Sequence, residues 1–261
     1  MLKAKVGYSK NVDAYEAGVE TAKTSTEGMD AKIALLFNSV GYDQKKLMEG
    51  IKSVATDVDV IGCTSSAGII TPDGYMIDES GTAGMLTLGG DDLTVACYGM
   101  AKGKSARETG REVAKKALEK AGLDYAPDYF FMSASPAEEE EYIKGIQDVI
   151  GRVPCFGGSA ADNTVEGKWS IFYNDTIFND GVVAAFFYTA NDIATVYTGA
   201  YNETKDMGII TKLNDTRVLA EIDGEPALDK YKNWRGLDDE AVTGGNLLVT
   251  TITSPLGVKD R

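Results

Sequence analysis

The fold is decided by Ile33-Ala-Leu-Leu-Phe-Asn-Ser39, a helix-like stretch, and then Val58-Asp-Val-Ile-Gly-Cys-Thr-Ser-Ser-Ala-Gly68. A second region about 95 residues later has the same pattern. It contains Asp128-Tyr-Phe-Phe-Met-Ser-Ala134, a helix-like stretch, and Arg152-Val-Pro-Cys-Phe-Gly-Gly-Ser-Ala-Ala-Asp162. Each region therefore predicts an apolar strand, a helix, and a second strand that ends in a Gly/Ser-rich loop.

A gapless alignment of the two regions brings glycines and helix faces into register. The aligned pairs are Phe37/Met132, Gly50/Gly145, Ile51/Ile146 and Gly62/Gly157. Both helices also have an apolar i, i+4, i+7 face, formed by Leu47, Ile51 and Val54 in one and by Tyr142, Ile146 and Val149 in the other. We predict an internal duplication; the alternative is chance resemblance between two ordinary β–α–β stretches.

The alignment extends beyond the loops, where residues 84–95 match residues 184–195 and Gly99 matches Gly199. Each stretch has two β-rich runs joined by a short Gly/Asn/Asp turn, which is a hairpin signal. We predict an α/β fold: a layered sandwich of mixed β-sheets and helices, built from two duplicated β-α-β-β-β halves. These halves form a domain at residues 1–200.

Helix boundaries follow from capping motifs. Ser135-Pro-Ala-Glu138 is a capping box that predicts the start of the second half's helix. The glutamates at 138–141 are better explained by the positive helix N-terminus, which favours negative side chains, than by a cation site. Ser105-Ala-Arg-Glu108 opens a further helix that Gly122 closes. Its small-residue stripe predicts close packing and comprises Ala106, Thr109, Gly110, Val113, Ala114 and Ala117.

The pattern stops repeating after Tyr201, so residues 201–261 are expected to form a short, separate α+β segment. Residues 207–213 and 217–222 predict a hairpin around Asn214-Asp215. A helix is expected from Pro226 to Trp234, with Gly236 as its stop, and a strand from Asn246 to Thr253.

Composition bounds the function. The 261 residues carry a net charge of −14, which repels phosphates and anionic lipid, so we expect neither nucleic acid nor a membrane as partner. No secretory signal or membrane-length apolar run is evident. Cys63, Cys97 and Cys155 have neither disulfide nor zinc spacing, and we expect a cytoplasmic protein with no cofactor and no metal.

The chain contains no histidine. This removes the commonest general base and the usual activator of a Ser or Cys nucleophile, which favours binding over catalysis. Two alternatives stay open: a hydrolase-like enzyme that uses Cys63 or Ser65 with another base, and a protein-interaction scaffold without a pocket.

The predicted binding site lies at the carboxyl ends of the strands, where ligands gather in parallel β–α–β units. Glycines let the backbone approach a ligand, and hydroxyls and N–H groups suit a carboxylate or carbonyl, while Asp162 adds a charge for an ammonium. The alternative is that such clusters only form tight turns. The predicted ligand-binding residues are Asn38, Ser39, Cys63, Thr64, Ser65, Ser66, Gly157, Gly158, Ser159, Asp162 and Asn163.

Several stretches in order resemble the FIST N domain: Val6-Gly-Tyr-Ser9, Ile61 to Ile70, Phe156 to Asn163 and Asp180-Gly-Val-Val183. Later residues resemble the start of the companion FIST C domain; they are Thr211-Lys212, Glu221 to Ala227, Tyr231 and Pro255 to Val258. The resemblance implies a sensory input domain of prokaryotic signal transduction that binds a small ligand, with amino acids as the usual suggestion. It also implies that a downstream signalling protein receives the signal.

Overall fold

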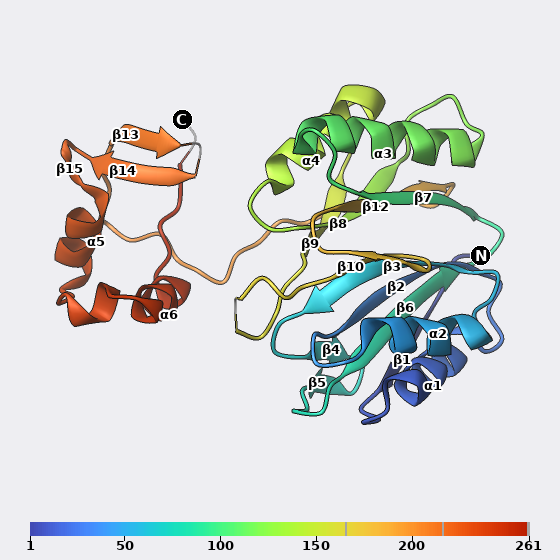
Figure 1. Cartoon of the computed structure of the whole chain (residues 1–261). Helices are drawn as coiled ribbons and strands as arrows, with labels where there is room; N and C mark the ends of the chain where they lie inside the picture. Colours follow the sequence, from blue (N-terminus) through green and yellow to red (C-terminus); the bar gives the residue numbers. More distant parts are fainter. Residues whose placement is uncertain (165, 216, 260–261) are drawn as a thin grey trace. The chain divides into compact units, whose positions relative to one another are not determined.

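The computed structural model describes residues 1–164, 166–215 and 217–259. The chain forms two compact units, Met1–Ala194 and Thr195–Arg261, which we describe separately (Figure 1).

The first unit contains two halves with the same order of elements. The first half comprises β1 (Lys3–Ser9), α1 (Ala14–Thr26), β2 (Ala31–Ser39), α2 (Gln44–Val54), β3 (Asp59–Ser65), β4 (Ile69–Thr71), β5 (Gly74–Met76) and β6 (Ala83–Gly89). The second comprises β7 (Leu93–Ala101), α3 (Ala106–Ala121), β8 (Tyr129–Ala134), α4 (Glu139–Ile150), β9 (Cys155–Ser159), β10 (Ile171–Tyr173), β11 (Thr176–Phe178) and β12 (Gly181–Thr189).

The sheets of the two halves also have the same strand order. It is β1-β6-β2-β3 in one sheet and β7-β12-β8-β9 in the other, and the β10–β11 hairpin extends the first sheet beside β3. In each half the third and fifth elements pair in parallel, β2 with β3 and β8 with β9, and the last strand pairs antiparallel with its neighbours. This correspondence is what an internal duplication predicts.

The two sheets lie face to face, and each pair of helices covers an outer face (Figure 1). One cluster of buried side chains fills the space between the sheets, including Ile61, Phe131 and Val183, and one further cluster lies under each helix pair. The predicted α/β sandwich of mixed sheets and helices is therefore confirmed.

Glycines let the helices of each pair approach backbone to backbone. A Cβ on Gly50 of α2 would lie 2.0 Å from the carbonyl oxygen of Tyr15 in α1, and one on Gly145 of α4 would lie 2.1 Å from that of Arg107 in α3. The predicted stripe of α3 is buried, Ser105 caps its N-terminus, and Gly122 ends it in the left-handed conformation. These predictions for α3 are confirmed.

The structure corrects the gapless alignment by one residue. Gly62 and Gly157 both have positive φ, and a Cβ on either would lie 1.8 Å from a carbonyl oxygen, that of Leu36 for Gly62 and of Met132 for Gly157. Leu36, not Phe37, is therefore the equivalent of Met132. The first half has one more residue between these strands, which a gapless comparison cannot show.

Two further expectations for the first unit are wrong. Residues 84–95 do not form a hairpin, because β6 and β7 belong to different sheets, and residues 184–195 do not form one because no strand follows β12 up to residue 200. The Ser135 capping box is also absent: α4 begins at Glu139, and the Ser135 hydroxyl donates to Asp180 and accepts the N–H of Gly181 instead. Competition from the neighbouring strand explains the loss of this cap.

The second unit contains β13 (Ile210–Asp215), β14 (Val218–Ile222), β15 (Glu225–Pro226), α5 (Ala227–Arg235), a 3₁₀ turn (Glu240–Val242) and α6 (Gly245–Thr253). The hairpin and the helix that stops at Gly236 are confirmed. The strand expected at Asn246–Thr253 is wrong, since this segment is helical. Thr251 Oγ1 donates to the carbonyl of Leu247 at 2.9 Å, which reconciles a β-branched residue with the helix.

Candidate ligand-binding site

The carboxyl ends of β2 and β3 lie side by side. Their parallel register places Asn38 beside Thr64 and Ser39 beside Ser65. The two polar clusters that the sequence predicts at these strand ends therefore share one edge of the sheet.

The loop that follows β9 lies against the same edge. The N–H of Ala161 donates to the carbonyl of Thr64 at 2.9 Å, and the N–H of Ala67 donates to Asn163 Oδ1 at 2.9 Å. The Thr64 hydroxyl also accepts the N–H of Ser170. The Gly/Ser loops of the two halves thus form one continuous region, and we call Ser65, Ser66, Ser159 and Asn163 the rim.

Burial divides the eleven predicted ligand-binding residues into two groups. Five are buried: Asn38, Ser39, Cys63, Thr64 and Asp162. The others are exposed or half-buried: Ser65, Ser66, Gly157, Gly158, Ser159 and Asn163. Only the second group presents its side chains or main chain to solvent.

Hydrogen bonds within the protein occupy most of the buried group. Ser39 Oγ accepts the N–H of Thr82 and lies 3.1 Å from its hydroxyl. Asn38 Nδ2 donates to Gln44 Oε1 at 2.7 Å, while Asn38 Oδ1 is buried without a hydrogen-bond partner among the described residues. A buried, unpaired acceptor is uncommon in folded proteins.

The sequence position of Asp162 suggests that it reaches outward to an ammonium group, but its carboxylate is directed into its own loop. Its carboxylate accepts the main-chain N–H groups of Thr164, Glu166 and Lys168 at 2.7–3.1 Å, and the residue is buried. Because the carboxylate accepts N–H groups from its own loop, its first role is to hold the shape of that loop.

Cys63 is not poised as a nucleophile. It is 3% exposed and lies between the two sheets, where the Ser133 hydroxyl is 3.5 Å from its sulfur. Burial raises the pKa of its thiol to about 11, despite the opposing hydrogen bond from Ser133. The Ser65 hydroxyl donates to the carbonyl of Gly68 at 2.9 Å, so it faces a weak acceptor, not a base.

The rim supplies hydroxyl and amide groups near one carboxylate. Ser66 and Asn163 are exposed, and the Ser159 hydroxyl donates to Glu139 at the start of α4. Gly157 and Gly158 offer only main-chain groups, on a strand that is the last one of its sheet. The rim can therefore bind a polar ligand through hydrogen bonds.

A charged cluster in the second half was not predicted from the sequence. Lys102 Nζ lies 2.6 Å from Glu138 and 3.0 Å from Asp180, whose carboxylate also accepts the Ser135 hydroxyl. Hydrogen bonds to Glu138 and then Asp180 raise the pKa of Lys102, so it stays protonated and cannot act as a base. The signal for this cluster was Asp180-Gly181, which the family resemblance had included.

Ser135 and Ser39 are structural equivalents. Ser39 pairs with Thr82, just before β6, and Ser135 pairs with Gly181, the first residue of β12. In each pair the serine N–H donates to the partner's carbonyl, and the serine Oγ accepts the partner's N–H. The offset alignment concealed this pair, because it matched Ser39 with Ala134.

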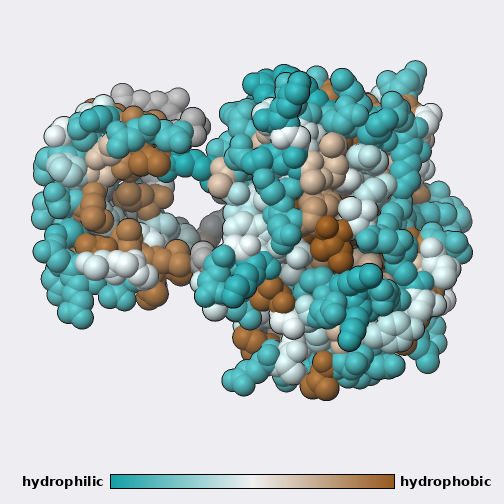
Figure 2. Space-filling view, in the orientation of Figure 1, coloured by the Kyte–Doolittle hydropathy of each residue, from teal (hydrophilic) through white to brown (hydrophobic). Residues whose placement is uncertain are grey.

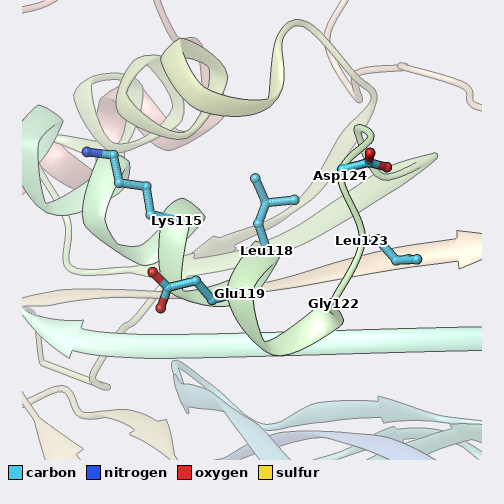
Figure 3. Close-up of a pocket in the computed structure, with 6 residues that line it drawn as sticks. All are labelled: Lys115, Leu118, Glu119, Gly122, Leu123 and Asp124. Carbon is cyan, nitrogen blue, oxygen red and sulfur yellow. The ribbon is translucent and has the colours of Figure 1, made fainter.

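A surface hollow of about 750 Å³ lies elsewhere, at the C-terminal end of α3 (Figure 3). It is lined by Lys115, Leu118, Glu119, Gly122, Leu123 and Asp124, and it contains none of the predicted site residues. Figure 2 shows mostly hydrophilic residues on the visible face of the first unit, with small separate apolar patches.

The described residues form neither a metal-binding cluster nor a membrane-spanning helix. Among residues 1–164, 166–215 and 217–259, no group of three or more Asp, Glu or Cys side chains could hold a metal ion. In the same part of the chain, no helix is long and apolar enough to cross a bilayer.

The fold and its polar edge define a two-sheet α/β domain whose accessible groups are suited to hydrogen bonding. A family model for the FIST N domain matches residues 32–225, and the chain belongs to this family of sensory domains in signal transduction. The match ends at residue 225, within the stretch that resembles the start of a FIST C domain, and it names only the FIST N domain, so the FIST C part stays a prediction.

Comparisons with individual proteins add little. A crystal structure of a cyanuric acid hydrolase from A. caulinodans aligns with a TM-score of 0.38 and 10% identity, covering 72% of this chain and 72% of the hydrolase. At this similarity the match supports no conclusion about activity. A search of curated proteins gave no match.

Proposed function

We propose that the chain is a sensor that binds a small polar molecule of the amino-acid class at the rim. One observation carries the proposal: the loops of both halves meet at Thr64 and leave the Ser66 hydroxyl and the Asn163 amide at the surface. The buried polar residues beside them position these loops.

The chemistry of the rim suits both ends of an amino acid. Hydroxyl and main-chain N–H groups around Ser65 and Ser66 would hold a carboxylate, as they do in other anion-binding loops. The Ser159–Glu139 pair supplies negative charge for the ammonium. The net charge of −14 also disfavours ligands with a net negative charge.

We further propose that residues 1–200 form the ligand-binding domain and residues 201–261 a partial FIST C-like segment, and that the protein works in the cytoplasm. A downstream signalling protein would receive the signal. Catalysis at Cys63 or Ser65 has less support, because neither residue faces a base.

The experiment is a thermal-shift screen of the purified chain against each common amino acid at millimolar concentration, because a ligand that binds the native state raises Tm. Calorimetric titration of any hit would follow, with Ser66→Ala expected to weaken Kd by about tenfold through loss of one hydrogen bond to a charged group. Ser53→Ala on α2 is the matched control. Absence of any shift would exclude an amino-acid ligand.

A further inference from the structure

The two halves contain hairpins of identical design in different surroundings. Both hairpins have two three-residue strands joined by two residues, with Ile70 opposite Tyr75 in β4–β5 and Phe172 opposite Ile177 in β10–β11. Ile70 and Phe172 therefore occupy the same position. Ile70 is 88% exposed, whereas Phe172 is 1% exposed.

Phe172 is buried because its hairpin covers the outer edge of β3. β10 pairs antiparallel with β3, with Phe172 opposite Gly62, and the Phe172 ring joins the core beneath α1 and α2. The pairing continues past both strand ends, where Asn174 N–H donates to the carbonyl of Val60 and Thr64 N–H to that of Ser170.

The equivalent edge in the second half is uncovered. β9 is the last strand of its sheet, and all five of its residues are exposed. Alternate residues of a strand direct their main-chain groups to the same neighbouring strand. Pro154 and Ala160 form hydrogen bonds with β8, so the main-chain groups of Cys155, Gly157 and Ser159 point away from β8. Within the described residues, no main-chain hydrogen bond reaches this side of β9.

This edge lacks the features that protect open edges from pairing. Edge strands are normally blocked by charged residues or proline, but β9 reads Cys-Phe-Gly-Gly-Ser and contains neither. The described residues of the first unit therefore include an open acceptor edge, β9, and an exposed hairpin, β4–β5. The corresponding hairpin and edge, β10–β11 and β3, already pair with each other between the halves.

We infer that the β4–β5 hairpin of one copy of this chain adds to the β9 edge of a second copy, as β10 adds to β3. Ile70 would lie opposite Gly157 of the second copy and would be buried as Phe172 is. The surfaces that meet are different, so the contact is head-to-tail and builds either a ring or a chain of copies.

The first test is the mass of the purified chain by light scattering from about 1 to about 200 µM. Species at multiples of 27.9 kDa are expected. Ile70→Asp should weaken Kd for self-association by at least about tenfold, because burial of an isoleucine side chain is lost. Val12→Asp is the matched control: Val12 is also largely exposed, but it precedes α1 and belongs to neither the β4–β5 hairpin nor β9.

The second test locates the contact with the native Cys155. Pro72 is the equivalent of Asn174, and Cys155 is the equivalent of Val60, so Pro72→Cys should form a disulfide-linked dimer with Cys155 under mild oxidation. Glu79→Cys is the control that should not cross-link. Cross-linking by Ser159→Cys instead would show that two β9 edges pair with each other.

A monomeric mass at every concentration would overturn the inference. So would self-association that Ile70→Asp leaves unchanged, or cross-linking of Ser159→Cys in preference to Pro72→Cys. Because Ile70 is exposed, an unchanged Tm for Ile70→Asp would show that the variant is folded and that its mass is informative.

Discussion

Thiol reactivity distinguishes a binding domain from an enzyme that uses Cys63. The chain has three free cysteines, of which Cys63 and Cys97 are buried and Cys155 is exposed. Thiolates are the reactive form, so both pKa and access control the rate. Burial raises the Cys63 pKa from 9.0 to about 11, which lowers its thiolate fraction at neutral pH by about a hundredfold.

A coloured disulfide reagent such as DTNB, in excess at neutral pH, gives the measurement. We expect one thiol per chain, Cys155, to react in the fast phase. Burial raises the pKa of both thiols, but Cys63 is also inaccessible, so it should react at least about tenfold more slowly. Cys155→Ser should remove the fast phase. In denaturant, all three cysteines of the unmodified chain should react.

Peptide mapping of the fast product would refute this reasoning if the label lay on Cys63. That result would mean that a neighbouring group lowers the Cys63 pKa in solution, and the hydrolase alternative would regain support. Fast labelling that persists in Cys155→Ser would lead to the same conclusion.

Three further changes test how the fold positions the site. Gly50→Ala should lower the free energy of unfolding by about 2 kcal/mol, because the new methyl overlaps the Tyr15 carbonyl of α1; urea unfolding measures this, and unchanged stability would contradict the packing. Ser105→Ala should cost about 1 kcal/mol through loss of the α3 cap, by the same assay, and a neutral result would contradict the cap. The hydrogen bond from Arg107 holds the pKa of Asp148 below its usual value. Its contribution to the free energy of unfolding is therefore complete above the unfolded pKa, near pH 4, and declines as pH falls further. Asp148→Asn should flatten this dependence of stability on acid pH, and an unchanged profile would refute the argument.

Local signals in the sequence predicted the elements that depend on local interactions. Ser105 and Gly122 bound α3 as expected, because a cap and a left-handed stop act within one turn of the helix. The strand predicted at Asn246–Thr253 failed for a matching reason. Its β-branched residues favour a strand only beside another strand, and this segment forms α6 instead.

Long-range pairing could not be derived from the sequence. β6 and β7 are joined by a short turn that looks like a hairpin, yet β6 pairs with β1 and β2 and β7 pairs with β12. The crossing of β10 to β3 is equally invisible in the sequence, because the equivalent hairpin β4–β5 pairs with no further strand in the described part of the chain. Periodicity identifies strands, but partners depend on the core that each face covers.

The polar residues of the site show why composition at strand ends overstates a binding site. Ser39 was predicted as a ligand contact, but its hydroxyl and N–H serve Thr82, and Ser135 serves Gly181 in the same way. Main-chain groups at a strand end need partners once the ladder stops, and a serine supplies them at both equivalent positions.

Polar groups that the fold does not already use in hydrogen bonds are the candidates for binding a ligand. A strand-end hydroxyl with a main-chain partner in both halves is explained by the fold, because each half must close the same ladder. Ser66 lies beyond the ladder, on an exposed turn that Asn163 of the other half holds in place. The Asn163–Ala67 hydrogen bond joins the two halves, and neither sheet needs it to complete its own main-chain hydrogen bonds. The fold therefore does not explain the polar groups around Ser66, and this part of the rim is the part that remains for a ligand.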